Sequence, residues 1–175
     1  MRHQRRVQVY ATTLSDGAQA EDIAFSVEDK LRITRQLDEF GVPYVEGGWP
    51  GANPKDSEYF ERVRRLSLKQ ARVVAFGSTR RARHAAADDE TLRALVAAGT
   101  PAVTIFGKSW DLHVKEVLRV PEDENLAMIA DSVSFLKGKV AEVFYDAEHF
   151  FDGCRGNRAY ALATLEAAAR AGADC

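Results

Sequence analysis

The sequence predicts an α/β fold, specifically a partial (β/α)8 TIM barrel with about five β/α units around a parallel sheet. Short apolar runs with strand character alternate with longer stretches whose apolar residues recur at helical spacing. Each apolar run ends in glycine, serine or charged residues rather than in a tight hairpin turn. Such connections favour ligand binding at the carboxyl ends of parallel strands, in a barrel or in a doubly wound sheet. The barrel is preferred because no G-x-G-x-x-G follows the first run.

The first β/α unit is the clearest. Residues 10–19 follow an apolar run with strand character at Val7 and Val9, and they are expected to form the first strand with its first loop, which holds an Asp-Gly pair. A helix is predicted over 23–40, where apolar residues lie on one face and a glycine follows the last turn. Ser26 can cap this helix, because an acidic residue stands three positions later.

The later units repeat this pattern of a short apolar strand, a polar tip and a helix closed in most cases by glycine. The predicted strands cover residues 42–45, 72–76, 102–106 and 142–145. The predicted helices cover residues 58–68, 90–98, 110–118, 125–136 and 158–171. Residues 173–175 are expected to approach a sixth strand.

Length and composition limit the number of domains and the kinds of partner. The chain has 175 residues, of which 46% are hydrophobic and 29% charged, and its formal net charge is −2. We expect residues 1–175 to form part of one barrel domain, because a complete barrel needs roughly 250 residues. So small a net charge gives no general attraction to nucleic acid or to a membrane. Cys154 and Cys175 are too few for a disulfide framework and favour a cytoplasmic location.

Five longer motifs lie in the first helix or at the ends of strands. They are F-S-V-E-D-K-L-R-I (25–33), Y-V-E-G-G-W-P-G-A-N-P-K-D (44–56), A-F-G-S-T-R-R (75–81), V-T-I-F-G-K-S-W-D-L-H-V (103–114) and Y-D-A-E-H-F-F-D-G (145–153). With these motifs the chain resembles the isopropylmalate/homocitrate synthase family, and within it the citramalate synthases. The resemblance covers nearly the whole chain, and it implies the N-terminal portion of a metal-dependent, HMG-CoA-lyase-like TIM-barrel acyltransferase.

The resemblance implies a reaction in which acetyl-CoA and pyruvate give (R)-citramalate and CoA, on a route to isoleucine. A divalent metal, Mg²⁺ or Mn²⁺, would polarise the keto acid, and a cation near the thioester oxygen would stabilise the enolate. The expected partners are therefore small molecules rather than nucleic acid or membrane, and the full-length parent is expected to be a homodimer.

The resemblance also implies roles for individual residues. The family's metal-binding aspartate falls on Asp16, and the glutamate that orients its catalytic arginine falls on Glu148, the expected catalytic residue. The positions expected to line the substrate site are Gln19, Glu46, Ser109 and His113. Arg80 and Arg81 lie where cations could meet the phosphates of CoA.

On pattern alone, several of these residues have simpler interpretations. Asp16 precedes a glycine and fits an ordinary turn, and the two arginines fit a solvated basic loop. His113 is equally compatible with a packed histidine. His149 is expected to point away from Glu148, because side chains alternate along a strand.

The chain departs from the family pattern at three points. The family's D-T-T-L-R-D-G is A-T-T-L-S-D-G here, so Ala11 replaces an aspartate and Ser15 replaces the arginine that stabilises the enolate. A serine hydroxyl supplies neither the charge nor the planar fork of a guanidinium. The family's H-x-H metal pair follows a sixth strand and has no counterpart here.

These departures lead us to expect that the chain is inactive or nearly so by itself. Three alternatives to citramalate synthesis remain open. One is isopropylmalate or homocitrate synthesis with a larger keto acid, and another is an aldol-type lyase on the same barrel. The third is a non-catalytic fragment that associates through the open edges of its sheet.

Overall fold

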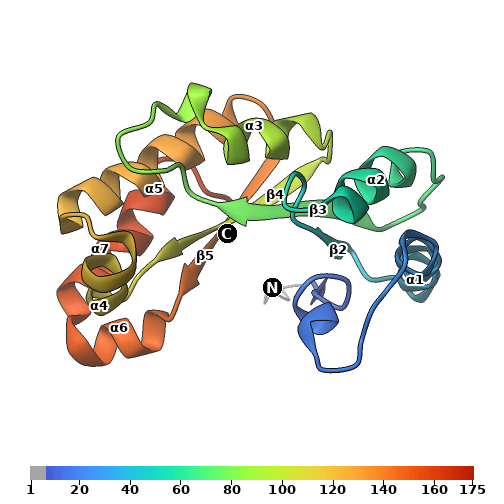
Figure 1. Ribbon diagram of the computed structural model, residues 1–175, viewed down its shortest axis with the longest axis horizontal. Coiled ribbons are helices and arrows are strands. Elements are labelled where there is room, and N and C mark those ends of the chain that lie inside the picture. The colour runs from blue at the N-terminus through green and yellow to red at the C-terminus, as the bar shows by residue number, and fades with distance from the viewer. Residues whose placement is uncertain (1–6) are drawn as a thin grey trace, which may run out of the picture.

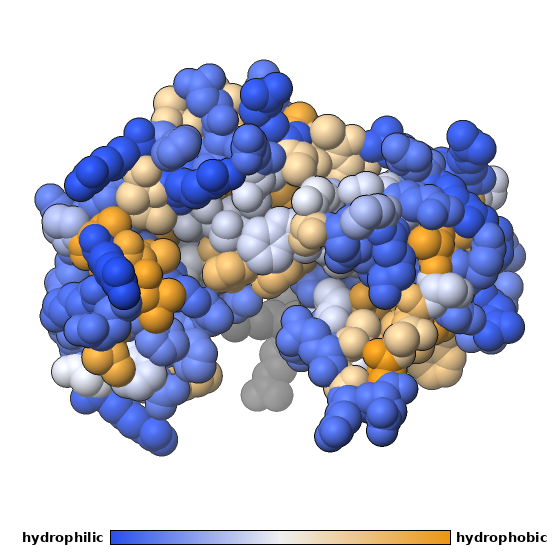
Figure 2. Space-filling model, in the orientation of Figure 1, coloured by the Kyte–Doolittle hydropathy of each residue, from blue (hydrophilic) through white to orange (hydrophobic). Residues whose placement is uncertain are grey.

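The computed structural model describes residues 7–175, which contain one sheet of five parallel strands in chain order. The sheet is curled, helices cover its outer side, and no helix of the described residues covers its inner side (Figure 1). Figure 2 shows the molecule hollowed on that inner side. The prediction of a partial barrel with five β/α units is therefore confirmed. The strands are β1 (Tyr10–Ala11), β2 (Tyr44–Gly48), β3 (Arg72–Ser78), β4 (Ala102–Lys108) and β5 (Glu142–Glu148).

Helices follow every strand and form the outer layer. The α-helices are α1 (Val27–Phe40), α2 (Pro54–Val63), α3 (Glu90–Ala97), α4 (Asp111–His113), α5 (Glu122–Lys137), α6 (Phe150–Gly156) and α7 (Arg158–Arg170). Two short 3₁₀ helices, η1 (Asp16–Gln19) and η2 (Ala86–Asp88), and a π-helix, η3 (Val114–Leu118), complete the set. None of the helices within residues 7–175 is both long and apolar enough to cross a membrane.

Helix α1 begins where its capping chemistry places it. The side chain of Ser26 accepts a hydrogen bond from the backbone of Asp29, whose carboxylate accepts one from the backbone of Ser26. This reciprocal pair is a capping box, and it starts the helix at Val27 rather than at residue 23. Gly41 ends the helix with a left-handed φ of 87°, as predicted for a glycine at this point.

Helix boundaries elsewhere differ from the prediction for identifiable reasons. Helix α2 starts at Pro54 rather than at residue 58, because Asn53 caps it and proline suits a first turn. The predicted helix over 110–118 is instead a short α4 followed by the π-helix η3. Helix α6 was not predicted, because it contains two glycines and follows a run of polar residues.

Four strands run further toward their carboxyl ends than the sequence predicts. Strands β3 and β4 end at Ser78 and Lys108 rather than at residues 76 and 106. Strand β2 continues through Gly47 and Gly48, and β5 continues to Glu148. A Cβ on Gly47 would overlap the ring of Tyr59, so the glycine allows α2 to pack directly on the strand. The end of β5 stays paired with β4, where Lys108 and Glu148 are register partners. Polar side chains at this position are compatible with a strand because they face the open inner side of the sheet.

The two faces of the sheet differ in what they pack against. Alternate residues such as Val73, Val103 and Val143 point outward into the main hydrophobic core under the helices. The residues between them point inward, where Tyr10, Tyr44 and Phe144 form an aromatic cluster with ring centroids 5.1–6.2 Å apart. The inner face therefore has an aromatic base, and its polar side chains lie further along the strands, toward their carboxyl ends.

Candidate functional site at the carboxyl ends of the strands

Four carboxylates gather on the inner side of the sheet and at its carboxyl-terminal mouth. They are Asp16 in η1, Glu46 in β2, and Asp146 and Glu148 in β5. Asp146 and Glu148 stand two residues apart on one strand and so share a face. Burial raises the pKa of Asp146, and the charges of Glu148 and Asp16 raise it further. Because the charges of both Asp16 and Glu148 act on the carboxyl of Asp146, these two residues lie at the same end of the sheet.

Glu46 is the buried centre of this group. Its carboxylate accepts a hydrogen bond of 2.5 Å from the Tyr10 hydroxyl and another from the Ser15 hydroxyl. Burial raises the pKa of Glu46, the two hydroxyl donors lower it in part, and the nearby charges of Asp146 and Asp16 raise it again. The carboxyl of Glu46 is therefore held by neutral donors, without a cation among its hydrogen-bonding partners.

A cation does face the mouth from β4. The ammonium of Lys108 forms an ion pair with the carboxylate of Glu148 directly across the β4–β5 pair. It also lies 5.4 Å from the centre of the Phe106 ring. The Lys108 side chain is only 16% exposed.

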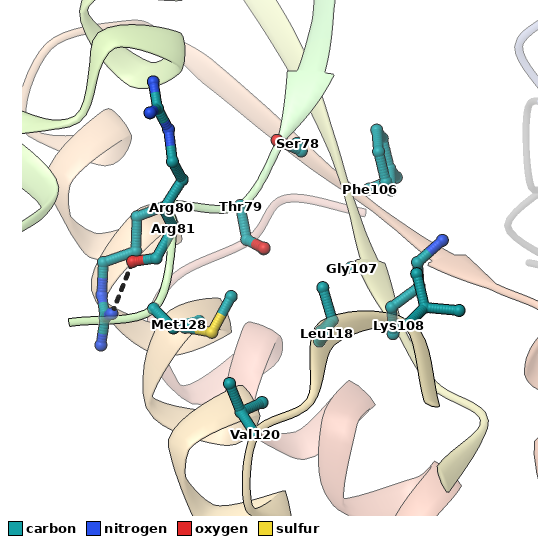
Figure 3. A pocket seen from close by; sticks show the side chains of 12 residues that line it. Ser78, Thr79, Arg80, Arg81, Phe106, Gly107, Lys108, Leu118, Val120 and Met128 are labelled. Atoms are coloured by element: carbon teal, nitrogen blue, oxygen red, sulfur yellow. Dashed lines mark hydrogen bonds between the residues drawn. The ribbon is translucent and has the colours of Figure 1, made fainter. Parts of the chain in front are cut away.

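A pocket of about 390 Å³ lies beside Lys108, between the ends of β3 and β4 and the segment that carries η3. Figure 3 shows Phe106 and Lys108 on one side of it, Arg80 and Arg81 on the other, and Leu118, Val120 and Met128 along its base. Most of its lining is apolar, with the basic residues at its edges. Its size and chemistry suit the apolar part of a ligand that carries negative charge.

The predicted substrate residues are spread over two sides of the sheet. Gln19 is exposed at the end of η1 and lines a second pocket, of about 270 Å³, together with Ser15. Ser109 is fully buried, and its hydroxyl accepts a 2.9 Å hydrogen bond from Thr164 of α7. Gln19 thus lies in the same short helix as Asp16, while the side chain of Ser109 is bound on the helix-facing side.

His113 packs against other aromatic rings. Its ring lies 4.6 Å from that of His149 and 4.8 Å from that of Trp110, measured between centroids. Strand alternation does not apply to His149, because β5 ends at Glu148 and His149 adopts a left-handed φ of 55°. The turn at His149 brings its ring next to that of His113.

Arg80 and Arg81, the two predicted CoA contacts, differ in exposure and in ion pairing. The guanidinium of Arg80 is buried between Glu124 and Asp131, at 3.0 and 2.8 Å. Arg81 is more exposed and pairs with Glu90 at 2.6 Å. Both line the pocket beside Lys108, but Arg80 already has its charge matched within the fold.

Sequence reasoning missed three residues of this site: Tyr10, Lys108 and Asp146. Asp146 carried a detectable signal, because a carboxylate two positions before Glu148 shares its face if the strand continues. Ending the predicted strand at residue 145 removed that signal. Tyr10 and Lys108 face the same side as these carboxylates, which only the pairing register of the sheet reveals.

Carboxylate oxygens suit a hard divalent cation, and Asp16 is exposed enough to bind one. Residues 7–175 nevertheless contain no group of three or more acidic, histidine or cysteine side chains placed to hold a metal ion. A metal site at Asp16 therefore stays a prediction.

Comparison with known proteins places this geometry in a family context. The HMGL-like family model matches residues 6–175. The chain is 56% identical over 169 residues to the (R)-citramalate synthase of Geobacter sulfurreducens, covering 97% of this chain and 32% of that protein. It is 31% identical over 170 residues to the 2-isopropylmalate synthase of Listeria innocua, covering 97% and 31%.

Among solved structures, an HMG-CoA lyase from Bacillus subtilis superposes with a TM-score of 0.64 at 17% identity. The match covers 96% of this chain and 56% of that one, and it supports the barrel fold. The chain spans about a third of the length of the curated relatives it matches.

Proposed function

The chain belongs to the HMGL-like family, and we propose that it forms the N-terminal part of a citramalate synthase. Such an acyltransferase condenses acetyl-CoA with pyruvate to (R)-citramalate, as a step toward isoleucine. The observation that carries this proposal is the contrast in identity. The chain is 48–56% identical to citramalate synthases but only 31% identical to 2-isopropylmalate synthases.

The acidic mouth supports this proposal chemically. A divalent metal ion, when bound, would polarise the keto acid as a Lewis acid. Asp16 would contribute an oxygen ligand to that ion, and Gln19 and Glu46 would line the acceptor site beside it. Glu148 would act at the opposite wall, with His113 nearby. The lining of the 390 Å³ pocket, which includes Arg80 and Arg81, is the proposed contact surface for acetyl-CoA. Ser109 would act indirectly, because its backbone N–H donates to the Glu148 carbonyl at 3.3 Å.

The second candidate is 2-isopropylmalate synthesis, which uses the larger keto acid 2-ketoisovalerate. It is supported by the 31% identity that extends over 97% of the chain. Phe76, Phe106 and Trp49 narrow the inner side of the sheet, with ring centroids 5.5–6.4 Å apart. These rings favour the smaller acceptor, pyruvate.

A chimera tests the proposal. Residues 6–175 would replace the matching N-terminal third of the Geobacter enzyme, and release of the CoA thiol would be followed with acetyl-CoA, Mg²⁺ or Mn²⁺ and either keto acid. We expect thiol release with pyruvate and much less with 2-ketoisovalerate. Equal or greater turnover with 2-ketoisovalerate would favour the second candidate. No turnover with either, from a folded chimera that carries the repairs described next, would refute both.

The departures at positions 11 and 15 set the expected rate. The loss of one oxyanion-stabilising donor costs on the order of a hundred- to a thousandfold in rate, so the chimera should be slow. Replacing Ser15→Arg together with Ala11→Asp should raise its thiol release toward that of the Geobacter enzyme. The 175-residue chain alone should release no thiol above background, which the same assay measures.

The proposal extends to the location and the assembly of the protein. The two cysteines are free thiols, which supports a reducing, cytoplasmic environment. A homodimer of the full-length protein is also part of the proposal, and light scattering of the chimera measures it.

A further inference from the structure

The mouth of the half-barrel contains one cationic side chain in direct contact with its carboxylates among the described residues. Lys108 and Glu148 are register partners on β4 and β5, and both side chains face the inner side. The hydroxyl of Ser15, at the position where the family pattern has arginine, is bound to Glu46. The positive charge at this mouth therefore comes from β4 and not from the first loop.

Lys108 also borders the apolar pocket. An ammonium has three N–H donors, and its ion pair with Glu148 uses one oxygen partner. The remaining donors have no other hydrogen-bond partner among the described residues. The same side chain lines the 390 Å³ pocket beside Leu118 and Met128. A ligand with an apolar arm in this pocket would bring a terminal oxygen close to the ammonium.

We propose that Lys108 is a catalytic residue that stabilises the oxyanion of the acetyl-CoA enolate. This inference rests on the proposed function. As a carboxylate of the mouth takes a proton from the acetyl methyl group, the C–H electron pair forms the C=C bond. The carbonyl π pair then moves onto the thioester oxygen, which becomes the oxyanion. The ammonium of Lys108 stays protonated throughout, and Glu148 holds it in place.

A labelling experiment tests the contact without relying on turnover. The probe is carboxymethyl-CoA, whose carboxylate imitates the enolate oxyanion, and CoA itself is the matched control that lacks this group. Reductive methylation of lysines in the chimera, read by peptide mass spectrometry, reports the accessibility of each ammonium. Saturating carboxymethyl-CoA should slow labelling of Lys108 at least tenfold, while CoA should not. Lys115, exposed and paired with Asp111 and Glu122, should label equally in all samples.

Variants add a kinetic readout. In the chimera that keeps Ser15, where no first-loop arginine can stabilise the same oxyanion, Lys108→Met should lower kcat at least thirtyfold and leave the KM for pyruvate within threefold. Lys108→Arg keeps the charge and should retain most of the activity. The control Lys115→Met should leave kcat unchanged.

The outcomes separate the two ideas. This inference is wrong if carboxymethyl-CoA binds but Lys108 is labelled as fast as in the free protein. It is also wrong if Lys108→Met leaves kcat unchanged in a chimera that turns over pyruvate. In both cases the proposed function stands. If the repaired chimera neither binds carboxymethyl-CoA nor releases thiol, the proposed function fails and this inference fails with it.

Discussion

The carboxylate of Asp38 accepts the backbone N–H of Ala71 at 2.7 Å, which ties the end of α1 to the start of β3. The same carboxylate accepts the N–H groups of Lys69 and Gln70. Asp38 is buried, and its carboxylate is the acceptor that the three backbone donors share. One acidic side chain thus fixes the turn that leads into the third strand.

We expect Asp38→Asn to lower the free energy of unfolding by about 2 kcal/mol, because an amide has one acceptor oxygen and places an N–H₂ against backbone donors. Urea denaturation at neutral pH measures this loss. Glu39→Gln, an exposed neighbour on the same helix, is the matched control and should change stability by less than about 0.5 kcal/mol.

The Asp38 contribution should also depend on pH. Burial raises the pKa of Asp38, but the three backbone donors outweigh burial and the net pKa lies below the ordinary value of 3.8. A lowered folded-state pKa gives stability that is complete above the unfolded pKa and is lost as the pH falls through the folded value. The difference in free energy of unfolding between the wild type and Asp38→Asn should therefore become smaller in acid. A difference in free energy of unfolding that stays constant from neutral pH to strong acid would contradict this account.

Glu46 should behave in the opposite sense. Burial is the main cause of its raised pKa, so the folded state binds a proton more tightly than the unfolded state does. Stability from this group is complete below the unfolded pKa and falls as the pH rises through the folded pKa. Glu46→Gln should therefore raise the melting temperature at neutral pH and have little effect in acid. Thermal unfolding at both pH values checks this, and a lower melting temperature at neutral pH would refute it.

Two glycines of α6 provide a comparison of steric effects. A Cβ on Gly153 would overlap the backbone carbonyl of Ser109, whereas a Cβ on Gly156 would lie 3.5 Å from its nearest neighbour, in Trp110. Gly153→Ala should destabilise the protein by about 1–3 kcal/mol despite the better helix propensity of alanine. Gly156→Ala should be close to neutral. Chemical denaturation of both variants checks the difference, and equal effects would show that α6 can shift away from the strand end.

Arg80 and Arg81 make a second matched pair. Arg80→Met leaves Glu124 and Asp131 without their shared partner, and because both acids are partly solvated we expect a loss of about 2 kcal/mol. Arg81 pairs at the surface, so Arg81→Met should cost less than about 0.5 kcal/mol. Denaturant midpoints measure the loss of stability in each variant. An equal loss in the two variants would mean that the burial of the Arg80 ion pairs adds nothing to stability.

Much of this fold can be predicted from local patterns because those patterns act locally. The capping box of Ser26 and Asp29, and the left-handed Gly41, define α1 without help from the rest of the chain. The sheet order follows from alternating strands and helices. The glycine-rich end of β2 could not be predicted, because Gly47 is in a strand only to admit the ring of Tyr59, a long-range contact.

The site was predictable only in part for the same reason. Family motifs indicate Asp16, Glu46 and Glu148, and the structure brings these residues to one mouth. The partnership of Lys108 with Glu148 depends on the register between two strands, and the position of His149 depends on a left-handed turn. Ser109 was predicted from its motif as a substrate-site residue, but the motif does not reveal that its hydroxyl accepts a hydrogen bond from Thr164 of α7.

The strand order β1-β2-β3-β4-β5 has a consequence for how the molecule assembles. Every strand pairs with the next one in the chain, so each pairing joins residues roughly 28 to 40 positions apart, at modest entropic cost. The polypeptide can therefore acquire its structure one unit at a time as it leaves the ribosome, without waiting for a distant partner strand to be made.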